Sequence, residues 1–566
     1  MQRIATASSA VRRAPSASGP APLRLPIFVG LLVGLLPATA VLSGCGGPKS
    51  PPKVPIVTAP EVAVPTPAAP ADPTLFAYLH IGDPIQFVQQ TLGGQYIEYA
   101  VQRGIKVADF QSGAPLVAFL WDPQGASLKE APAVVLAPLP SDGDLAGLIK
   151  STSPLLRTAP FAQSKTATVI TLGDAAQERA KASEAALLAL TQAKQPFEAT
   201  LHVNATPIMA KYGPLMHAGI KNMAPMLATA AAQSPSAPNA QSSVAMLDQL
   251  VSELEGLKSF TLGANTSEDD LLLSTLTASA DGTPGATAGG PLAVPDLAQF
   301  VPPGDLRLQW NTRDVKRLLD WYLRVYGGFL AAKPELKAQV DELLADWLKA
   351  GRTMETAASL SFDPAKGLVM QGLMRVPDSA AAMAAIRRIV KKFSSGPVHD
   401  QYKNLGIELT IKSQQGVRKV KGNPVDRYEY SFHRTADPGQ GQTPPAVKTL
   451  LDKMSGLTYE VAQVGPYLVY TIGAPIESVT DGLFAGKGPY PMAAMKNFPG
   501  GGTLYLELDM AGVMRWLKAV VPASRLPIVP ARASTVSAWS YDGGAVSYQR
   551  FVIPLGLIKA LSYAIR

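Results

Sequence analysis

One pattern recurs along this chain and limits the folds open to it. Each copy is a strand-like run of alternating apolar residues, followed by a short polar residue and the start of an amphipathic helix. Alternation buries one face of a strand, and an Asn or Asp at the junction can accept hydrogen bonds from the exposed amides of a helix start. The four copies are residues 76–88, 197–212, 306–319 and 504–517.

A second pattern, two alternating strands around a turn, follows each copy. Most of the turns contain Asp-Pro with a later Gly, or Asp-Gly-Gly, which are typical of β-hairpins. The paired stretches are 116–125 with 133–139, 259–270 with 271–278, 358–367 with 368–376, and 535–544 with 545–553. Three pairs end near a proline (Pro140, Pro377 and Pro554) and run into a further helical stretch. Additional strands are predicted at 166–172, 407–411 and 426–433, and an extra hairpin at 457–464 with 467–473.

The order of these elements is β-α-β-β-α-β, at least in part. It predicts an α+β fold of tandem βαββαβ-like modules, with antiparallel sheets and helices packed on one face. The second module is degenerate, because an Ala/Ser/Pro-rich stretch at 228–243 interrupts its helical region. The alternative is a non-repetitive α+β chain in which such patterns arise by chance.

The N-terminus has the charge order of a secretory signal. Residues 1–25 carry four arginines and no acid, and an apolar run follows from Ile27 through Val41. That run is short for a permanent membrane helix, which needs about 20 apolar residues. Arg12-Arg13 is not read as a twin-arginine signal, because the apolar run starts far downstream.

The stretch Leu42-Ser43-Gly44-Cys45 closes this run and contains the only cysteine of the 566 residues. It resembles the lipobox of bacterial lipoproteins. The resemblance implies that Cys45 receives a diacylglycerol, that cleavage follows before it, and that the new amine is acylated; several acyl chains anchor a protein firmly. Gly46 follows where an Asp would favour retention in the inner membrane, which implies the outer membrane, facing the periplasm. An uncleaved anchor and an ordinary secretory signal are the alternatives.

These features divide the chain into five parts. They are a signal peptide (1–44), a Pro/Ala-rich tether (45–73), a first α+β half of two modules (74–280), a linker (281–303) and a second half of two modules (304–566). Proline fixes φ and removes backbone donors, so the tether is predicted to be a semi-extended spacer of about 3 Å per residue.

Composition excludes several classes of site. Removing residues 1–44 takes four arginines from a formal net charge of +8 and leaves about +4, far from the charge of a nucleic-acid-binding protein. A lipidated Cys45 leaves no thiol for a disulfide, a metal site or a nucleophile. Hydrophobic residues make up 47% of the chain, enough for several apolar cores.

A basic set is the best candidate for a surface site. Four of its members lie on one predicted helix face and three crowd a predicted hairpin tip, where they could contact anionic lipid, lipopolysaccharide or an acidic partner. The alternative is a solvated helix face. The set comprises Arg387, Arg388, Lys391, Lys392, Arg418, Lys419 and Lys421.

Three further groups favour structural roles. His80 and His202 occupy matching strand positions and lack a third ligand, so solvent-facing positions are preferred over a paired metal site. Four methionines at near-helical spacing predict helix core rather than an adaptable groove; they are Met209, Met216, Met223 and Met226. Packing between helices is predicted for Trp321, Tyr322, Tyr326 and Trp347.

No hydrolase, zincin, P-loop or dinucleotide motif is present in the sequence, and each of those chemistries has a recognisable spacing. We therefore expect a non-enzymatic binding or scaffold protein without metal or cofactor. It would reach the membrane through Cys45 and bind an envelope protein or an amphiphile, not nucleic acid. The alternatives are a carrier of lipid or another hydrophobic ligand, a hydrolase with a scattered site, and a purely structural spacer.

Overall fold

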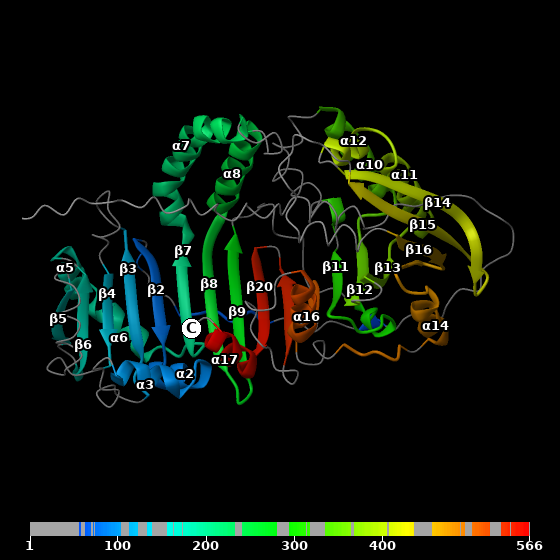
Figure 1. Cartoon of the computed structure of the whole chain (residues 1–566). Coiled ribbons are helices and arrows are strands. Elements are labelled where there is room, and N and C mark those ends of the chain that lie inside the picture. Colours follow the sequence, from blue (N-terminus) through cyan, green and yellow to red (C-terminus); the bar gives the residue numbers. More distant parts are fainter. Residues whose placement is uncertain are drawn as a thin grey trace, which may run out of the picture.

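The computed structural model covers the whole chain (Figure 1). It describes residues 56–57, 63–68, 72, 74–102, 113–122, 133–138, 156–161, 164–172, 174–232, 240–279, 294–312, 314–316, 334–363, 367–404, 407–434, 456–486, 488–492, 498, 501–520, 534–543 and 545–564. The lipobox and Cys45 lie outside the described residues.

The protein is built on one sheet of 18 strands, and every neighbouring pair in it is antiparallel. From one edge to the middle the order is β5 (Leu156–Phe161), β6 (Ser164–Leu172), β4 (Ala133–Ala137), β3 (Leu116–Trp121), β2 (Leu75–Ile81), β7 (Ala199–Asn204), β8 (Leu257–Thr266) and β9 (Asp270–Ser279). It continues with β20 (Val546–Pro554), β19 (Thr535–Asp542), β18 (Leu504–Asp509), β11 (Leu306–Thr312), β12 (Met354–Asp363), β13 (Gly367–Arg375), β17 (Tyr467–Ile472), β16 (Leu457–Val464), β15 (Asn423–Arg434) and β14 (Ile407–Val420).

The large antiparallel sheet with added helices confirms the coarse α+β prediction. The four recurring copies begin with β2, β7, β11 and β18, and each predicted hairpin pair is present. Helices α2 (Pro84–Thr91), α7 (Ala205–Ala232) and α16 (Met510–Val520) follow three of these strands. Asp83 is the N-cap of α2, and its side chain accepts a 2.9 Å hydrogen bond from the backbone amide of Gln86, which is the junction chemistry that the sequence indicates.

The two predicted halves share this sheet through the pairing of β9 with β20. The contact extends over the length of both strands, from Asp270 opposite Pro554 to Ala278 opposite Val546. The C-terminal helix α17 (Leu555–Ala564) also contacts α2 of the first half. The boundary in the sequence is therefore not a break in the hydrogen-bonded ladder.

Register assigns each residue to one of two faces, because directly opposed residues share a face and neighbours along a strand alternate. We name them the Tyr78 face and the Leu79 face. On the Tyr78 face, α5 (Asp174–Ala182) and α6 (Glu184–Gln192) pack over β3, β4 and β6 of the first half. Residues of η3 (Ala298–Phe300) and α14 (Glu477–Ala485) pack on the same face of the second half.

Helices also cover the opposite face, so the prediction that they pack on one face is wrong. On the Leu79 face of the second half, α11 (Ser379–Phe393) packs over β16 and β17, and α10 (Pro334–Lys349) packs beside α11. Leu468 and Tyr470 of β17 belong to this core, whereas Val469 between them belongs to the core on the Tyr78 face. A strand that is apolar on both sides can support two layers.

The described part of the tether lies on the folded body. Its strand β1 (Ile56–Val57) pairs with β10 (Val294–Pro295), and Val64 packs against the apolar core. The hydroxyl of Tyr78 donates a 2.7 Å hydrogen bond to the carbonyl of Ala68. A fully extended chain from Cys45 to Ile56 spans at most about 40 Å, so this docking limits how far the body can stand from an anchored cysteine.

The predicted linker contributes to the same core. Within residues 294–301, Leu297, Ala298, Phe300 and Val301 are fully buried. The side-chain amide of Gln309 on β11 accepts a 3.0 Å hydrogen bond from the backbone of Ala298. This segment therefore fixes the tether to the second half of the sheet.

The register between the two halves can be tested with a pair of cysteines. Thr277 lies directly opposite Ser547, and cross-strand partners have Cβ atoms about 5 Å apart. In a Cys45→Ser chain, Thr277→Cys with Ser547→Cys should form a disulfide on mild oxidation. The diagonal pair Thr277→Cys with Gln549→Cys, about 7–8 Å apart, should stay reduced. Thiol titration and mass measurement distinguish the two, and equal oxidation of both pairs would contradict the register.

Candidate functional site

The basic residues of α11 hold the second half together. Arg387 Nε forms a 2.6 Å ion pair with Asp426 of β15, and Arg388 Nε forms one of 2.6 Å with Asp346 of α10. Lys392 Nζ lies 2.7 Å from Glu342 of α10. Three of the four predicted surface cations thus join α11 to the strand beneath it and to the neighbouring helix.

Asp426 is the most buried carboxylate of this group, with 1% of its side chain exposed. Besides Arg387, it accepts a 2.9 Å hydrogen bond from the backbone amide of Gly416 and a 3.3 Å hydrogen bond from the hydroxyl of Tyr428. A buried charge needs such a complete set of partners, because desolvation of an unpaired ion costs several kcal/mol.

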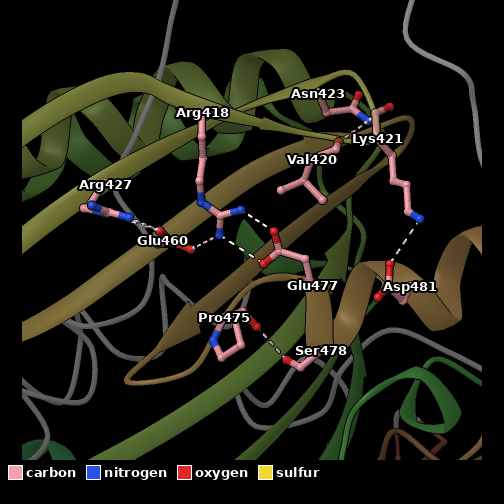
Figure 2. A network of polar contacts seen from close by, with 10 residues as sticks. All are labelled: Arg418, Val420, Lys421, Asn423, Arg427, Glu460, Pro475, Glu477, Ser478 and Asp481. Atoms are coloured by element: carbon pink, nitrogen blue, oxygen red, sulfur yellow. Dashed lines mark hydrogen bonds and ion pairs between the residues drawn. The ribbon is translucent and has the colours of Figure 1, made fainter.

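A second ion-pair network lies on the Tyr78 face of the same strands (Figure 2). Arg418 of β14 donates to both carboxylate oxygens of Glu477, which begins α14, and to Glu460 Oε2 of β16 at 2.6 Å. Arg427 Nη2 donates to the other oxygen of Glu460 at 2.9 Å. Lys421 Nζ lies 3.4 Å from Asp481 of α14. The network joins three strands and one helix.

The guanidinium group of Arg418 favours the ionised form of Glu477. The hydrogen bond from Arg418 lowers the pKa of Glu477 below its ordinary value, and the same contacts raise the pKa of Arg418. The contribution of Glu477 to stability is therefore complete above its unfolded-state pKa and is lost as the pH falls through the lowered value. A carboxyl group in this state does not serve as a general acid at neutral pH.

The predicted residues do not form one site: Arg387 pairs with Asp426 on one face of β15, whereas Arg418 belongs to the network on the opposite face, because Asp426 and Arg427 are neighbours on an alternating strand. The hairpin tip is confirmed: Lys421, with a φ of 50°, and Gly422 form the turn between β14 and β15. Five of the seven cations are in ion pairs. Lys391 and Lys419 are exposed, and within the described part of the chain their ammonium groups form no ion pair. Contact with an anionic surface remains a prediction.

The two predicted histidines lie on the Tyr78 face, so the expectation that both face solvent is wrong for His80, which is buried. His202 is half-buried, stacks on Tyr78 at 5.2 Å and lies 2.8 Å from the hydroxyl of Thr261. Burial lowers the pKa of both histidines and favours the neutral imidazole. Within the described residues, no group of three His, Cys, Asp or Glu is placed to hold a metal ion.

The methionine series gives a surface that the sequence prediction missed. Met209 is buried, but Met216, Met223 and Met226 are exposed on α7, so the helix-core prediction is wrong for those three. They project from the hairpin that α7 forms with α8 (Ala240–Glu255). The absence of any acidic residue from 199 to 247 is the signal that could have revealed it.

The predicted aromatic cluster is described only in part. Trp347 packs against the apolar core on the Leu79 face, and its packing with the other three aromatic residues stays a prediction. Trp321, Tyr322 and Tyr326 lie outside the described residues.

Comparison with protein-family models, with curated proteins and with solved structures finds no match to this chain. In the described part of the chain, no helix combines the length and the apolar character needed to cross a membrane. The function of this protein is therefore inferred from its own sequence and geometry.

The structural role of the Arg387–Asp426 pair gives a test. Asp426→Asn should lower the free energy of unfolding by about 3 kcal/mol, because it leaves Arg387 largely buried without its counter-ion. Arg387→Met combined with Asp426→Asn should recover part of that loss. Urea unfolding followed by circular dichroism measures both effects. Lys391→Met on the same helix is the matched control and should change stability by less than about 0.5 kcal/mol. An unchanged Asp426→Asn midpoint would contradict the assignment.

Proposed function

We propose that this chain is a lipid-anchored protein of the bacterial cell envelope that acts by binding, as a scaffold. The anchor follows from the lipobox-like stretch that ends at Cys45. The short reach from Cys45 to the docked strand β1 supports a body held close to the membrane surface. Outer-membrane attachment facing the periplasm is the placement we propose.

The distribution of exposed apolar side chains carries the binding part of the proposal. Ten large apolar side chains are exposed in the described part of the chain, and six of them lie on α7 and α8. Concentrated exposed apolar area marks interaction surfaces, whereas scattered single residues do not. The charged residues first considered for a site serve instead in ion pairs within the second half.

We also propose that the two halves are related as tandem pairs of modules. The first strands of the modules meet in each half, as β2 with β7 and β11 with β18. In each half a later hairpin joins the sheet through its second strand, because β6 pairs with β4 and β17 pairs with β13. The long hairpin β14–β15 is then an addition of the second half.

A carrier of amphiphiles is the second candidate, and the Leu79 face of the first half favours it. Leu79 of β2 is opposite Leu201 of β7, and Ala77 is opposite Leu120 of β3. Leu120 and Leu201 are exposed although they belong to interior strands of the sheet. In the second half, α10 and α11 cover the equivalent face. An acyl chain on the open strip would bury area that is now in water.

Cell fractionation tests the anchor. Cys45→Ser should lower the membrane-bound fraction of the protein, because one residue carries the acyl chains. Intact mass of the membrane-extracted wild type should correspond to a chain that begins at an acylated Cys45. Ser43→Thr is a control that preserves Cys45 and should leave the acylated mass unchanged. Equal membrane association and equal N-terminal mass of wild type and Cys45→Ser would refute lipidation.

Native mass spectrometry tests the carrier alternative. If the Leu79 face binds amphiphiles, protein purified in mild detergent should retain phospholipid or fatty acid in stoichiometric amount. Leu120→Asp with Leu201→Asp should abolish this retention, because carboxylates on the strip would be desolvated by an acyl chain. Val417→Asp, at an exposed apolar site on β14, is the control and should retain it. Lipid-free wild type would reject the carrier role and leave the scaffold role in place.

A further inference from the structure

The hairpin α7–α8 extends beyond the edge of the sheet (Figure 1). It is fixed at its base, where Lys211 Nζ forms a 2.6 Å ion pair with Asp122 after β3. Between the helices, His217 of α7 lies 2.6 Å from Asp248 and 3.3 Å from Glu255, both of α8. The acids of α8 thus lie in its second half, which leads back to the sheet at β8.

Toward the tip of the hairpin, large exposed side chains of α7 are apolar. Leu215, Met216, Met223 and Met226 are exposed, and Met226 has 73% of its surface in contact with solvent. Methionine is flexible and polarizable, which suits a surface that meets an irregular apolar partner. Leu250 and Leu254 of α8 are exposed as well, beside the acids that lie nearer the sheet.

The charge pattern around α7 indicates which kind of partner its exposed apolar surface would bind. Residues 199–247 contain Lys211 and Lys221 but no aspartate or glutamate. The distal surface of α7 combines the exposed Met223 and Met226 with Lys221 and carries no carboxylate of its own, which is complementary to the interface of a bilayer that contains anionic lipids. A soluble partner with an ordinary mixed surface offers no comparable reason for excluding acids.

The shape of α7 suits such a contact. Pro214 and Pro225 lie inside the helix, and proline in a helix interior removes a backbone hydrogen bond and bends the axis. Figure 1 shows α7 rising past the sheet edge and then turning over toward α8. Its distal part can therefore lie along a surface that the proximal part approaches end-on.

We propose that the distal part of the α7–α8 hairpin is a second membrane contact, which inserts Met223 and Met226 into the interface of an anionic lipid bilayer. This contact is separate from the acyl anchor, because it is formed by side chains of α7 and not by the acyl chains on Cys45. It adds a lipid surface to the partners of the scaffold and sets the face that the body presents to the membrane.

Vesicle flotation tests the proposal with the chain from residue 45 onward carrying Cys45→Ser, so that no acyl chain contributes. The protein should float with vesicles of phosphatidylglycerol and phosphatidylethanolamine and much less with vesicles of phosphatidylcholine alone. Met223→Asp with Met226→Asp should reduce the bound fraction at least tenfold. Lys221→Glu should reduce binding several-fold, and only to the anionic vesicles. Val101→Asp, at an exposed apolar site on α3 (Gly94–Gln102), is the matched control and should bind like the parent.

A second variant gives a readout that does not depend on the charged substitutions. Met226→Trp should fold normally at this exposed position, and its emission should shift to the blue when anionic vesicles are added. Absence of flotation by the parent chain, or an unshifted Met226→Trp spectrum, would overturn the proposal. So would sedimentation showing a dimer that Met223→Asp with Met226→Asp dissociates, because the surface would then bind a second copy. Neither result bears on lipidation of Cys45, which is read from the N-terminal mass.

Discussion

The backbone ladder between β9 and β20 is the contact on which the architecture depends. It joins two sets of strands into one sheet of 18, and the alternation of side chains is transmitted across it without a change of face. Because period-two alternation is strict, a shift of one residue in this pairing would exchange the faces of every strand beyond it. The packing of α5 and α6 on one side and of α10 and α11 on the other both presuppose this register.

The same alternation explains why the second half contains so many ion pairs. Strand β15 carries Asp426 and Arg427 as neighbours, so one side chain meets α11 and the other meets Glu460 on the opposite face. Charge-assisted hydrogen bonds thus join the sheet to α11 through Asp426 and, through Arg418 beside Glu460, to Glu477 of α14. A half-satisfied network would cost more than an apolar core, which explains why carboxylates of α10, β15, β16 and α14 are paired with these cations.

Local chemistry in the sequence was sufficient to place most strands and hairpins. The alternating runs and the Asp83 junction predict their elements correctly, because those signals act within a few residues. Long-range order was beyond the sequence: nothing local distinguishes a strand covered on one face from β17, where Leu468 and Val469 belong to two different cores. For this reason the sequence did not predict that His80 is buried, or that helices cover both faces of the sheet.

At the candidate site, too, the sequence predicted local positions but not the contacts between distant segments. Spacing on a helix placed Arg387, Arg388 and Lys392 on one face, but it could not show that Asp346, Asp426 and Glu342 would be brought opposite them from distant segments. For the methionines, helical spacing alone is compatible with either core or surface. The charge pattern of the surrounding chain, which has no acid from 199 to 247, carries the information that spacing lacks.

A docked tether and an apolar hairpin reinforce one another if Cys45 is acylated. An anchor that allows at most about 40 Å of free chain before β1 confines the body to a thin layer beside the bilayer. Confinement raises the effective concentration of lipid at the hairpin, so a contact that a free protein makes only at high lipid concentration is occupied continuously in a tethered one. Two exposed methionines and one lysine are appropriate to that task. A hairpin of moderate affinity, which binds vesicles when lipid is abundant, fixes the tilt of the sheet and leaves permanent retention to the acyl chains.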